Sequence, residues 1–475
     1  MPEIRRHVAI YWTGRMVARL VSFLLIPVYT AYIIPADWGI LNLFIVSGDL
    51  ALLMISCQLP SALYRFWALS KSEAEKRELS GLVMLTPAII SIPLFLPIYI
   101  WAESFSNFAG ISGYGNYIRV LLVTMQLNLI FNVIQTEMRL RNESGLYALL
   151  EIGLNFALAG INIFFVVVMT LGIKGILIGN LVIYIFFVSM MLPRFLHRSS
   201  LNINRRALKK MLAFSLPLIP SALAMASVHN IDRYIIQWLQ GPVDVGLYSM
   251  GYKFGMLVNI IVFGPFLLVW EPKSYEFAGE RNASDKYGEV FSYLLALTVF
   301  VAIGLTGASN EIVQVMTHQR YWGACQVIPL IGWSYVLFAM DGVARMGLLV
   351  NHKTKTLAMV VLLTCVINII GNLILVVKMG IVGAAWSTLI SFATLFLLDC
   401  ILARKHLPIN WQWRRLGIIA IAAVIIIYGM LSLKGMLLWQ MVVAKGAALL
   451  FFPLLLLLFG FFNKKELAFI FRRNK

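Results

Sequence analysis

The sequence predicts an all-α integral membrane protein of about 14 transmembrane helices, with two six-helix lobes related by pseudo-twofold symmetry plus two C-terminal helices. Composition, the length of the apolar runs and an internal repeat support this prediction. Hydrophobic residues make up 60% of the 475 residues and charged residues 13%, and the mean hydropathy is +0.85. Soluble domains carry about 25% charged residues. The apolar runs are long and continuous, whereas barrel strands are short and alternating.

Fourteen apolar runs are long enough to cross a bilayer as helices. The first contains Arg15 and lacks a small-residue cleavage site, so we expect it to remain as a span and not to be a signal peptide. The predicted spans are residues 8–33, 38–63, 79–101, 117–138, 146–169, 173–193, 211–230, 246–270, 288–307, 323–350, 356–377, 381–403, 416–434 and 437–461.

The basic residues predict the orientation, because loops with many lysines and arginines stay in the cytoplasm. With the N-terminus inside, 28 of the 39 lysines and arginines fall in inner segments. Five fall in outer loops, namely Lys174, Arg233, Arg320, Lys378 and Lys434. Both termini are therefore predicted to be cytoplasmic. The net charge of +18 is explained by topology and by contacts with anionic lipids, and nucleic acid is not an expected partner.

Two short motifs repeat at nearly the same offset. The run PADWGI (35–40) recurs as PVDVGL (242–247), 207 residues later (242 minus 35), and GIKG (172–175) recurs as GIVG (380–383), 208 residues later. Each six-span half is therefore expected to be a copy of the other, as in transporters built from parallel repeats. The predicted domains are an N-lobe (1–200), a C-lobe (201–407) and a C-terminal helix pair with a basic tail (408–475).

Basic side chains inside the spans predict a site for an anionic group. Arg15 and Arg19 lie one turn apart on one face of the first span, and Lys253 and Arg345 lie within later spans. Charges at this depth are costly unless they face a cavity or a partner, and arginine binds phosphate oxygens in a bidentate manner. A diphosphate would satisfy such a cluster. The alternative is an internal ion-pair network, for which Asp341 and Arg345 have the i,i+4 spacing.

The remaining buried charges were assigned from their depth. Asp49, Glu151 and Asp341 are candidates for ion coupling, because carboxyl groups in apolar surroundings can exchange protons, although they could also simply neutralise the arginines. Asp399 lies close to the cytoplasmic end of its span and is expected to be solvated. Lys445 lies near the outer end of its span and is expected to extend to the interface.

Proline positions match between the two halves. Pro27 falls in the first span, and Pro217 and Pro220 fall in the seventh, its equivalent. Because proline removes a backbone hydrogen bond, both spans are expected to bend. Such bends would suit rocking between inward-open and outward-open states.

The chain carries no enzymatic constellation, so an enzyme is not expected. The six histidines are scattered over loops and span ends, and the four cysteines have no metal-ligand spacing. There is no nucleophile elbow and no phosphate-binding loop. Neither a metal site nor a cofactor is predicted.

Several motifs together resemble the bacterial polysaccharide-biosynthesis flippases of the Wzx type, which handle O-antigen or exopolysaccharide precursors. These belong to the multidrug/oligosaccharidyl-lipid/polysaccharide exporter superfamily, with the lipid II flippase and the MATE drug exporters. The matching stretches are GR (14–15), PADWGI (35–40), SLPLIP (215–220), DRYII (232–236), VGLYS (245–249) with Lys253 behind it, and WEP (270–272).

The resemblance implies two six-helix lobes in a V, a cationic central cavity, and alternating access coupled to a proton or sodium gradient. The implied substrate is an undecaprenyl-diphosphate-linked oligosaccharide, moved from the cytoplasmic to the outer leaflet of the bacterial inner membrane. Membrane lipids are implied partners, and polysaccharide polymerase or chain-length machinery is a candidate one. Two alternatives stay open: a MATE-type cation or drug antiporter, and a membrane-embedded polymerase or ligase, which would need a larger outer loop than any predicted here.

Overall fold

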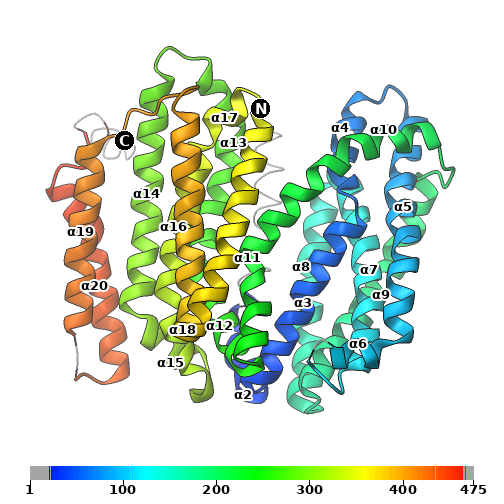
Figure 1. Cartoon of the computed structure of the whole chain (residues 1–475), viewed down its shortest axis with the longest axis horizontal. Helices are drawn as coiled ribbons and strands as arrows, with labels where there is room; N and C mark the ends of the chain where they lie inside the picture. Colours follow the sequence, from blue (N-terminus) through cyan, green and yellow to red (C-terminus); the bar gives the residue numbers. More distant parts are fainter. Residues whose placement is uncertain (1–20, 22, 109, 434, 464–465, 467–475) are drawn as a thin grey trace. The chain divides into compact units, whose positions relative to one another are not determined.

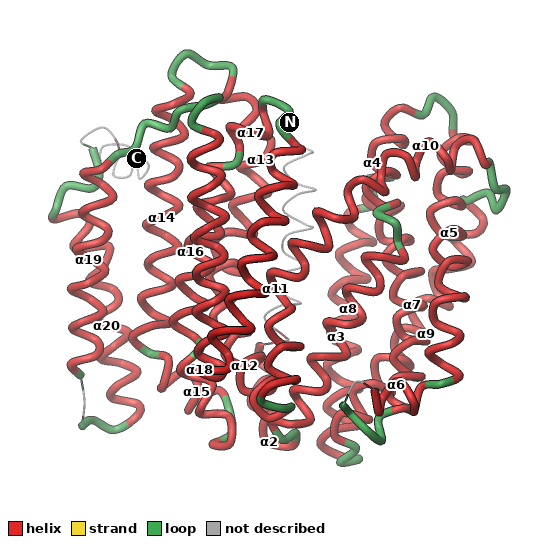
Figure 2. Tube along the Cα trace, in the orientation of Figure 1, coloured by secondary structure: helices red, strands yellow, loops and turns green. Residues whose placement is uncertain are grey.

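The computed structural model describes residues 21, 23–108, 110–433, 435–463 and 466. Within them all regular secondary structure is helical, and short loops connect the helices (Figure 2). The prediction of an all-α membrane protein is confirmed. Contacts group the chain into two units, one ending at Gly246 and the other beginning at Leu247.

The first unit holds ten α-helices in its described part. They and two short π or 3₁₀ segments are α2 (Ile26–Tyr32), α3 (Pro35–Ile55), α4 (Leu59–Leu69), α5 (Glu73–Ile100), α6 (Ala102–Phe108), α7 (Gly115–Leu140), α8 (Ser144–Ile163), η1 (Phe164–Val168), α9 (Gly172–Arg198), α10 (Arg205–Ser215), η2 (Leu216–Leu218) and α11 (Ile219–Leu239). α11 packs on α3, and α10 packs on α4. The predicted lobes, 1–200 and 201–407, describe the repeat and stay a prediction.

α12 (Pro242–Gly255) begins in the first unit and continues into the second. The second unit then contains η3 (Asn259–Phe263), α13 (Gly264–Ala278), α14 (Ala283–Gly307), α15 (Ser309–Met316), η4 (Gln319–Gln326), α16 (Ile328–Ala344), α17 (Met346–Val350), α18 (Thr354–Ala403), α19 (Trp413–Ser432) and α20 (Leu438–Leu458).

Twelve helical stretches in the described part of the chain are long and apolar enough to cross a membrane. One of them, α18, has 50 residues and is broken at Gly380, where φ is 58° and ψ is −138°. This break lies between the predicted spans 356–377 and 381–403, so α18 contains both. The first predicted span lies mostly outside the described residues, and the total of 14 stays a prediction.

The predicted repeat has a structural counterpart in its turns. Pro35 and Pro242, which are 207 residues apart, each begin a helix, where a missing N–H costs nothing. Gly172 and Gly380, 208 residues apart, both have the left-handed backbone, with φ of 55° and 58°. Glycine adopts this conformation without strain. The two halves therefore share a helix that begins at proline at one junction and a glycine with positive φ at the other.

The equivalent glycines of the repeated motif pack against each other within the first unit. A Cβ atom on Gly39 would lie 2.1 Å from the carbonyl oxygen of Pro242. A Cβ atom on Gly246 would lie 1.9 Å from the carbonyl oxygen of Pro35. The contact is reciprocal, like an isologous interface between two copies. Glycine at both positions lets the first turns of α3 and α12 approach backbone to backbone.

Proline interrupts the helix at both predicted sites. Pro27 lies in the first turn of α2. In the other half, the 3₁₀ turn η2 contains Pro217 and separates α10 from α11, whose first turn contains Pro220. The ring of proline clashes with the preceding turn and removes one hydrogen bond, which explains why a new helix begins at each place.

Aromatic side chains form the core of the second unit around α13, α14 and α16. Trp270 donates its Nε1–H to the carbonyl oxygen of Gly342 at 3.2 Å, and Tyr287 donates to the carbonyl oxygen of Ser274 at 2.6 Å. Phe338 packs against Phe263 and Phe392. These contacts fix α16 against its neighbours, and α16 carries the acidic residue described below.

The C-terminal helices α19 and α20 pack on α14 in the second unit (Figure 1). The side chain of Met430 in α19 fills the space over Gly307. Lys445 in α20 is only 6% exposed, and its Nζ lies 2.6 Å from Oε1 of Glu311 in α15. The prediction that Lys445 extends to the interface is wrong, because a buried glutamate partner makes the interior favourable.

Candidate functional site

Of the four predicted cationic residues, the structure describes two. Arg15 and Arg19 lie outside the described residues. Lys253 lies near the end of α12, in the second unit, and is half-buried. Arg345 follows α16 directly and is also half-buried. A cluster of all four stays a prediction.

A buried acidic pair is the best-defined candidate site in the second unit. Asp341 near the end of α16 and Asp399 in the second half of α18 are each 1% exposed. Their side chains lie in hydrogen-bond contact. One guanidinium nitrogen of Arg345, Nη1, lies 3.9 Å from Oδ2 of Asp341.

The hydrogen-bonding groups at this pair are only partly satisfied. Asp341 Oδ1, Asp399 Oδ1 and Arg345 Nε are buried and have no hydrogen-bond partner in the part of the chain that the structure describes. A hydrogen bond between two carboxyl groups requires a proton on one of them. With that proton the two carboxyl groups and the arginine are together neutral. Without it they leave one uncompensated buried negative charge, which is costly.

The burial of Asp399 corrects the expectation that it is solvated. α18 continues to Ala403, and α16 packs along it, so Asp399 is covered although it lies close to the end of its span. Hydropathy locates the end of a span but does not show which face a neighbouring helix covers. The signal available in the sequence was the presence of an aspartate, Asp341 or Asp399, in each of two predicted spans.

The contact with Asp341 also bears on the role of Arg345. The i,i+4 ion pair that the spacing predicted is present, at 3.9 Å. Because this contact is long and Arg345 Nε has no partner among the described residues, the guanidinium can donate to a further group. Arg345 is therefore a partner of the acidic pair, and its binding of an anionic substrate stays a prediction.

The other two predicted acidic residues belong to the first unit. Asp49 in α3 is exposed, and Glu151 in α8 is half-exposed. Glu151 accepts a hydrogen bond from Nε2 of Gln135 in α7 at 2.8 Å. The charges of both carboxylates act on the hydroxyl of Tyr184 in α9. Asp49 and Glu151 therefore share one region of this unit.

Sequence reasoning missed a buried polar network within α18. Nδ2 of Asn368 donates to Oγ of Ser391 at 3.0 Å, and Ser387 Oγ donates to the Asn368 carbonyl oxygen at 2.9 Å. Nδ2 of Asn372 donates to Oδ1 of Asn368 at 3.2 Å, and Asn372 Oδ1 itself is unpartnered among the described residues. Two asparagines four residues apart in an apolar run were the available signal, since they share one helix face.

Arg233 was assigned to an outer loop, and this assignment is wrong. α11 continues to Leu239, and Arg233 lies inside it with 6% exposure. Its Nη1 lies 3.0 Å from Oδ1 of the neighbouring Asp232 and also donates to the carbonyl oxygen of His229 at 2.8 Å. Two adjacent charged residues, Asp232 and Arg233, favoured a loop in the sequence. In the structure they form an ion pair, and the helix continues through both.

In the described part of the chain, no group of three or more histidine, cysteine, aspartate or glutamate side chains is placed to hold a metal ion.

A sequence model described as "Polysaccharide biosynthesis protein" matches residues 4–277, more than half of the chain. The chain belongs to this polysaccharide biosynthesis protein family. The resemblance drawn from residues 14–15, 35–40 and 215–272 is confirmed at the level of the family, because these motifs lie inside the matched range.

A curated relative carries the description "Probable low-salt glycan biosynthesis flippase Agl15" and comes from Haloferax volcanii. It is 23% identical to this chain over 226 residues, which cover 44% of this chain and 47% of the relative. The chain thus spans about half the length of this curated relative.

Solved structures share the fold over most of the chain. A structure of the lipid II flippase MurJ in an inward closed conformation matches with a TM-score of 0.75 and 14% identity, covering 94% of this chain and 97% of that one. An inward-facing MATE family multidrug transporter matches with a TM-score of 0.65 and 14% identity, covering 82% and 94%. These likenesses establish the transporter fold for the polysaccharide biosynthesis protein described here.

Proposed function

We propose that the protein is a flippase that moves an undecaprenyl-diphosphate-linked oligosaccharide from the cytoplasmic to the outer leaflet of a bacterial inner membrane. It would do so by alternating access driven by a proton or sodium gradient, with both termini cytoplasmic. The observation that carries the proposal is the combination of membership in the polysaccharide biosynthesis family with a flippase-type fold over nearly the whole chain. The curated glycan flippase relative supports the same activity.

The proposed roles follow the chemistry of the side chains. Arg15, Arg19, Lys253 and Arg345 would bind the diphosphate and the sugar, because cations stabilise phosphate oxygens most where water is excluded. Asp49, Glu151 and Asp341 would take part in ion coupling. Among these, Asp341 has the strongest structural support, because it lies beside Asp399 and Arg345. One proton on the two carboxyl groups makes these three side chains neutral together.

Proton uptake at the acidic pair gives a simple coupling scheme. The protonated pair with Arg345 is neutral and can remain buried, whereas the deprotonated pair carries a net negative charge that favours exposure to water. A transporter that closes over this pair only when it is protonated would link proton movement to its conformational cycle. The polar network of Asn368, Asn372 and Ser391 offers amide and hydroxyl oxygens, which are ligands suited to a hard cation such as sodium.

Reconstitution into vesicles tests the proposal directly. Full-length protein is incorporated into liposomes that contain undecaprenyl-diphosphate carrying a fluorescently labelled oligosaccharide. A membrane-impermeant quencher then measures how much label lies in the outer-facing leaflet as a pH or sodium gradient is imposed. Protein-dependent, gradient-dependent movement of the label supports the flippase. Equal movement in empty liposomes contradicts it.

The double variant R15A/R19A tests the role of the first span. We expect transport to fall about tenfold or more, since each lost charge-assisted contact to phosphate is worth about 1.5–3 kcal/mol. R119A is the matched control, because Arg119 near the start of α7 donates to the Tyr99 carbonyl oxygen at 3.1 Å and to Asn116 Oδ1 at 2.6 Å. Wild-type transport by the double variant would remove these arginines from the mechanism.

The two alternatives make different predictions in the same system. The MATE fold match supports a cation or drug antiporter, which would extrude cationic drugs and leave the lipid-linked glycan in place. A polymerase or ligase would lengthen or transfer the glycan, which gel analysis of the recovered lipid detects. Movement of an unaltered glycan lipid separates the flippase from both.

A further inference from the structure

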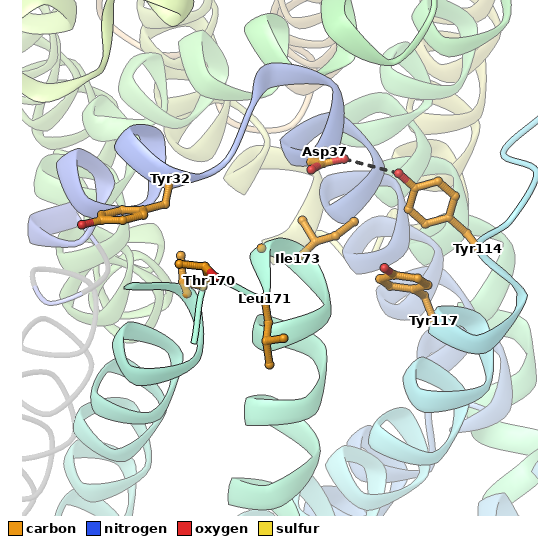
Figure 3. Close-up of a pocket in the computed structure, with 9 residues that line it drawn as sticks. Tyr32, Asp37, Tyr114, Tyr117, Thr170, Leu171 and Ile173 are labelled. Atoms are coloured by element: carbon orange, nitrogen blue, oxygen red, sulfur yellow. Dashed lines mark hydrogen bonds between the residues drawn. The ribbon is translucent and has the colours of Figure 1, made fainter. Parts of the chain in front are cut away.

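A polar pocket in the first unit is not used by the mechanism above. It has a volume of about 320 Å³ and lies where α2, α3, α7 and α9 end or begin (Figure 3). Its principal polar residues are Tyr32, Asp37, Tyr114, Tyr117 and Thr170, and we call it the tyrosine pocket. Its volume lies at the lower end of the range for ligand pockets, about 300–1,000 Å³.

Asp37 and Tyr114 form the fixed part of the tyrosine pocket. Asp37 lies in the first turn of α3, and its Oδ1 accepts a hydrogen bond from the Tyr114 hydroxyl at 3.3 Å. Burial and then the charge of Asp37 raise the pKa of Tyr114 to about 12, so this hydroxyl stays a donor at neutral pH. A carboxylate has about four acceptor positions, so Asp37 can also accept hydrogen bonds from a ligand.

Aromatic rings supply the adjoining wall. The ring centroids of Tyr114 and Tyr117 are 5.0 Å apart with an interplanar angle of 51°. Figure 3 shows both tyrosines on the side of the pocket opposite Thr170 and Leu171. The two rings therefore cover part of each other, and the surface that the pocket presents to a ligand is mainly polar.

The opposite wall depends on an unusual backbone. Thr170 has φ of 52°, and Gly172, two residues later, has φ of 55°. Left-handed backbone is uncommon for a β-branched residue, and such strain persists only where the surrounding structure enforces it. The turn brings Thr170 and Leu171 to the edge of the pocket before α9 begins.

The lining excludes some ligand classes and favours another. Among the described residues that line the tyrosine pocket none is a lysine or an arginine, so this lining favours a neutral polar ligand over a phosphate group. Its hydroxyl groups both donate and accept hydrogen bonds, and its carboxylate accepts them. Vicinal hydroxyls of a sugar ring both donate and accept as well, so they match this mainly polar lining.

We propose that the tyrosine pocket binds a sugar residue of the translocated glycan by hydrogen bonds to Asp37 and Tyr117. The inference rests on the proposed flippase function for its substrate class. The turns that form the pocket, near residues 33–37, 110–116 and 169–172, belong to the side predicted to face away from the cytoplasm. The pocket therefore contacts the glycan on the side where it is delivered.

Binding of simple sugars tests the tyrosine pocket without the lipid substrate. Saturation-transfer NMR is recorded on the full-length protein in nanodiscs with a panel of methyl glycosides of neutral hexoses and N-acetylhexosamines. D37N keeps an acceptor for Tyr114 but removes the charge, and Y117F removes only a hydroxyl group. We expect binding to weaken about tenfold in D37N and about threefold in Y117F. Y99F, which removes a phenol hydroxyl outside the pocket, is the matched control and should bind like the wild type.

The outcomes separate this inference from the proposed function. Glycoside contacts that weaken in D37N and Y117F but not in Y99F support the tyrosine pocket, even if no lipid-linked glycan moves in the vesicle assay. Normal vesicle transport by D37N and Y117F, together with no glycoside contact in the wild type, overturns the pocket and leaves the flippase intact. Binding of a monovalent cation alone, abolished by D37N, also overturns it.

Discussion

At the residue scale, the most informative side chains are the buried carboxyl groups. Asp341 and Asp399 are each 1% exposed and lie in contact, with Arg345 at 3.9 Å. Two ionised carboxylates in such surroundings would repel each other strongly, and one proton on the pair would remove that repulsion. The sequence identified Asp341 from its depth, but only packing showed that Asp399 completes the pair.

Replacing Asp399 tests the coupling role. D399N can still hydrogen-bond to Asp341 but cannot release a proton, so we expect gradient-driven transport to fall to near background while exchange without a gradient continues. The vesicle assay described above measures both. D285N is the control, because Asp285 is an exposed acceptor for Asn410 at 2.7 Å. Gradient-driven transport at the wild-type rate in D399N would exclude the pair from coupling.

The reciprocal glycines give a second prediction at this scale. G39A or G246A would place a methyl group within about 2 Å of a backbone carbonyl oxygen, so α3 and α12 must separate. We expect a loss of about 1–3 kcal/mol or more in stability, seen as a lower melting temperature in detergent. G48A on the same helix is the control, because its Cβ would meet only Met125 side-chain atoms, at 3.6 Å. Equal melting temperatures in G39A and G48A would refute the close approach.

At the element scale, ion pairs attach helices that hydrophobic packing alone would leave undefined. Lys445 connects α20 to α15 through Glu311, and both side chains are nearly fully buried. Glu143, just before α8, connects to Arg194 and Arg198 at the end of α9. The buried Lys445–Glu311 pair selects one arrangement, since any other leaves a buried charge without a partner, whereas the Glu143 pairs are partly exposed to solvent.

Breaking the Lys445–Glu311 pair should therefore be costly. K445M leaves Glu311 buried and unpaired, and we expect a loss of about 3–5 kcal/mol. The double variant K445M/E311L should recover most of this loss, because two apolar side chains replace the pair. Thermal unfolding in nanodiscs measures the difference, with K378M as an exposed control. If K445M and K445M/E311L have the same stability, leaving Glu311 without Lys445 costs nothing, and the prediction is wrong.

The Glu143 cluster predicts a pH dependence. Burial alone would raise the pKa of Glu143. The hydrogen bond from Arg198 and the charges of Arg194 and Arg198 lower it by more, so the pKa of Glu143 lies below its usual value. A lowered folded-state pKa means that the stabilisation is complete above the unfolded value, about 4.3, and is lost as the pH falls through the folded value.

We therefore expect wild type to be more stable than E143Q at pH 7, with the difference shrinking as the pH falls below about 4. Melting temperatures measured between pH 3 and pH 7 provide the comparison. A difference between the two proteins that does not change with pH would show that the ionised form of Glu143 is not what stabilises the α8–α9 contact.

At the scale of the whole molecule, the repeat explains why distant segments share one geometry. Pro35 and Pro242 begin corresponding helices, and Gly172 and Gly380 have nearly the same φ. The first half of the chain nevertheless carries residues that the second half lacks, such as Arg15 and Arg19 in place of Ala222 and Ala226. A duplicated scaffold with unequal side chains is suited to binding one asymmetric substrate.

Hydropathy, charge distribution and the internal repeat were sufficient to predict an all-α membrane protein and the break at the turn before residue 381, and the resemblance of short motifs indicated its family. They act locally along the chain, so a single sequence reveals them. The burial of Asp399, the pairing of Lys445 with Glu311 and the continuation of α11 through Arg233 depended on which helices pack together. Side chains far apart in the sequence meet only in the folded chain, and that is where the carboxyl pair and the tyrosine pocket are formed.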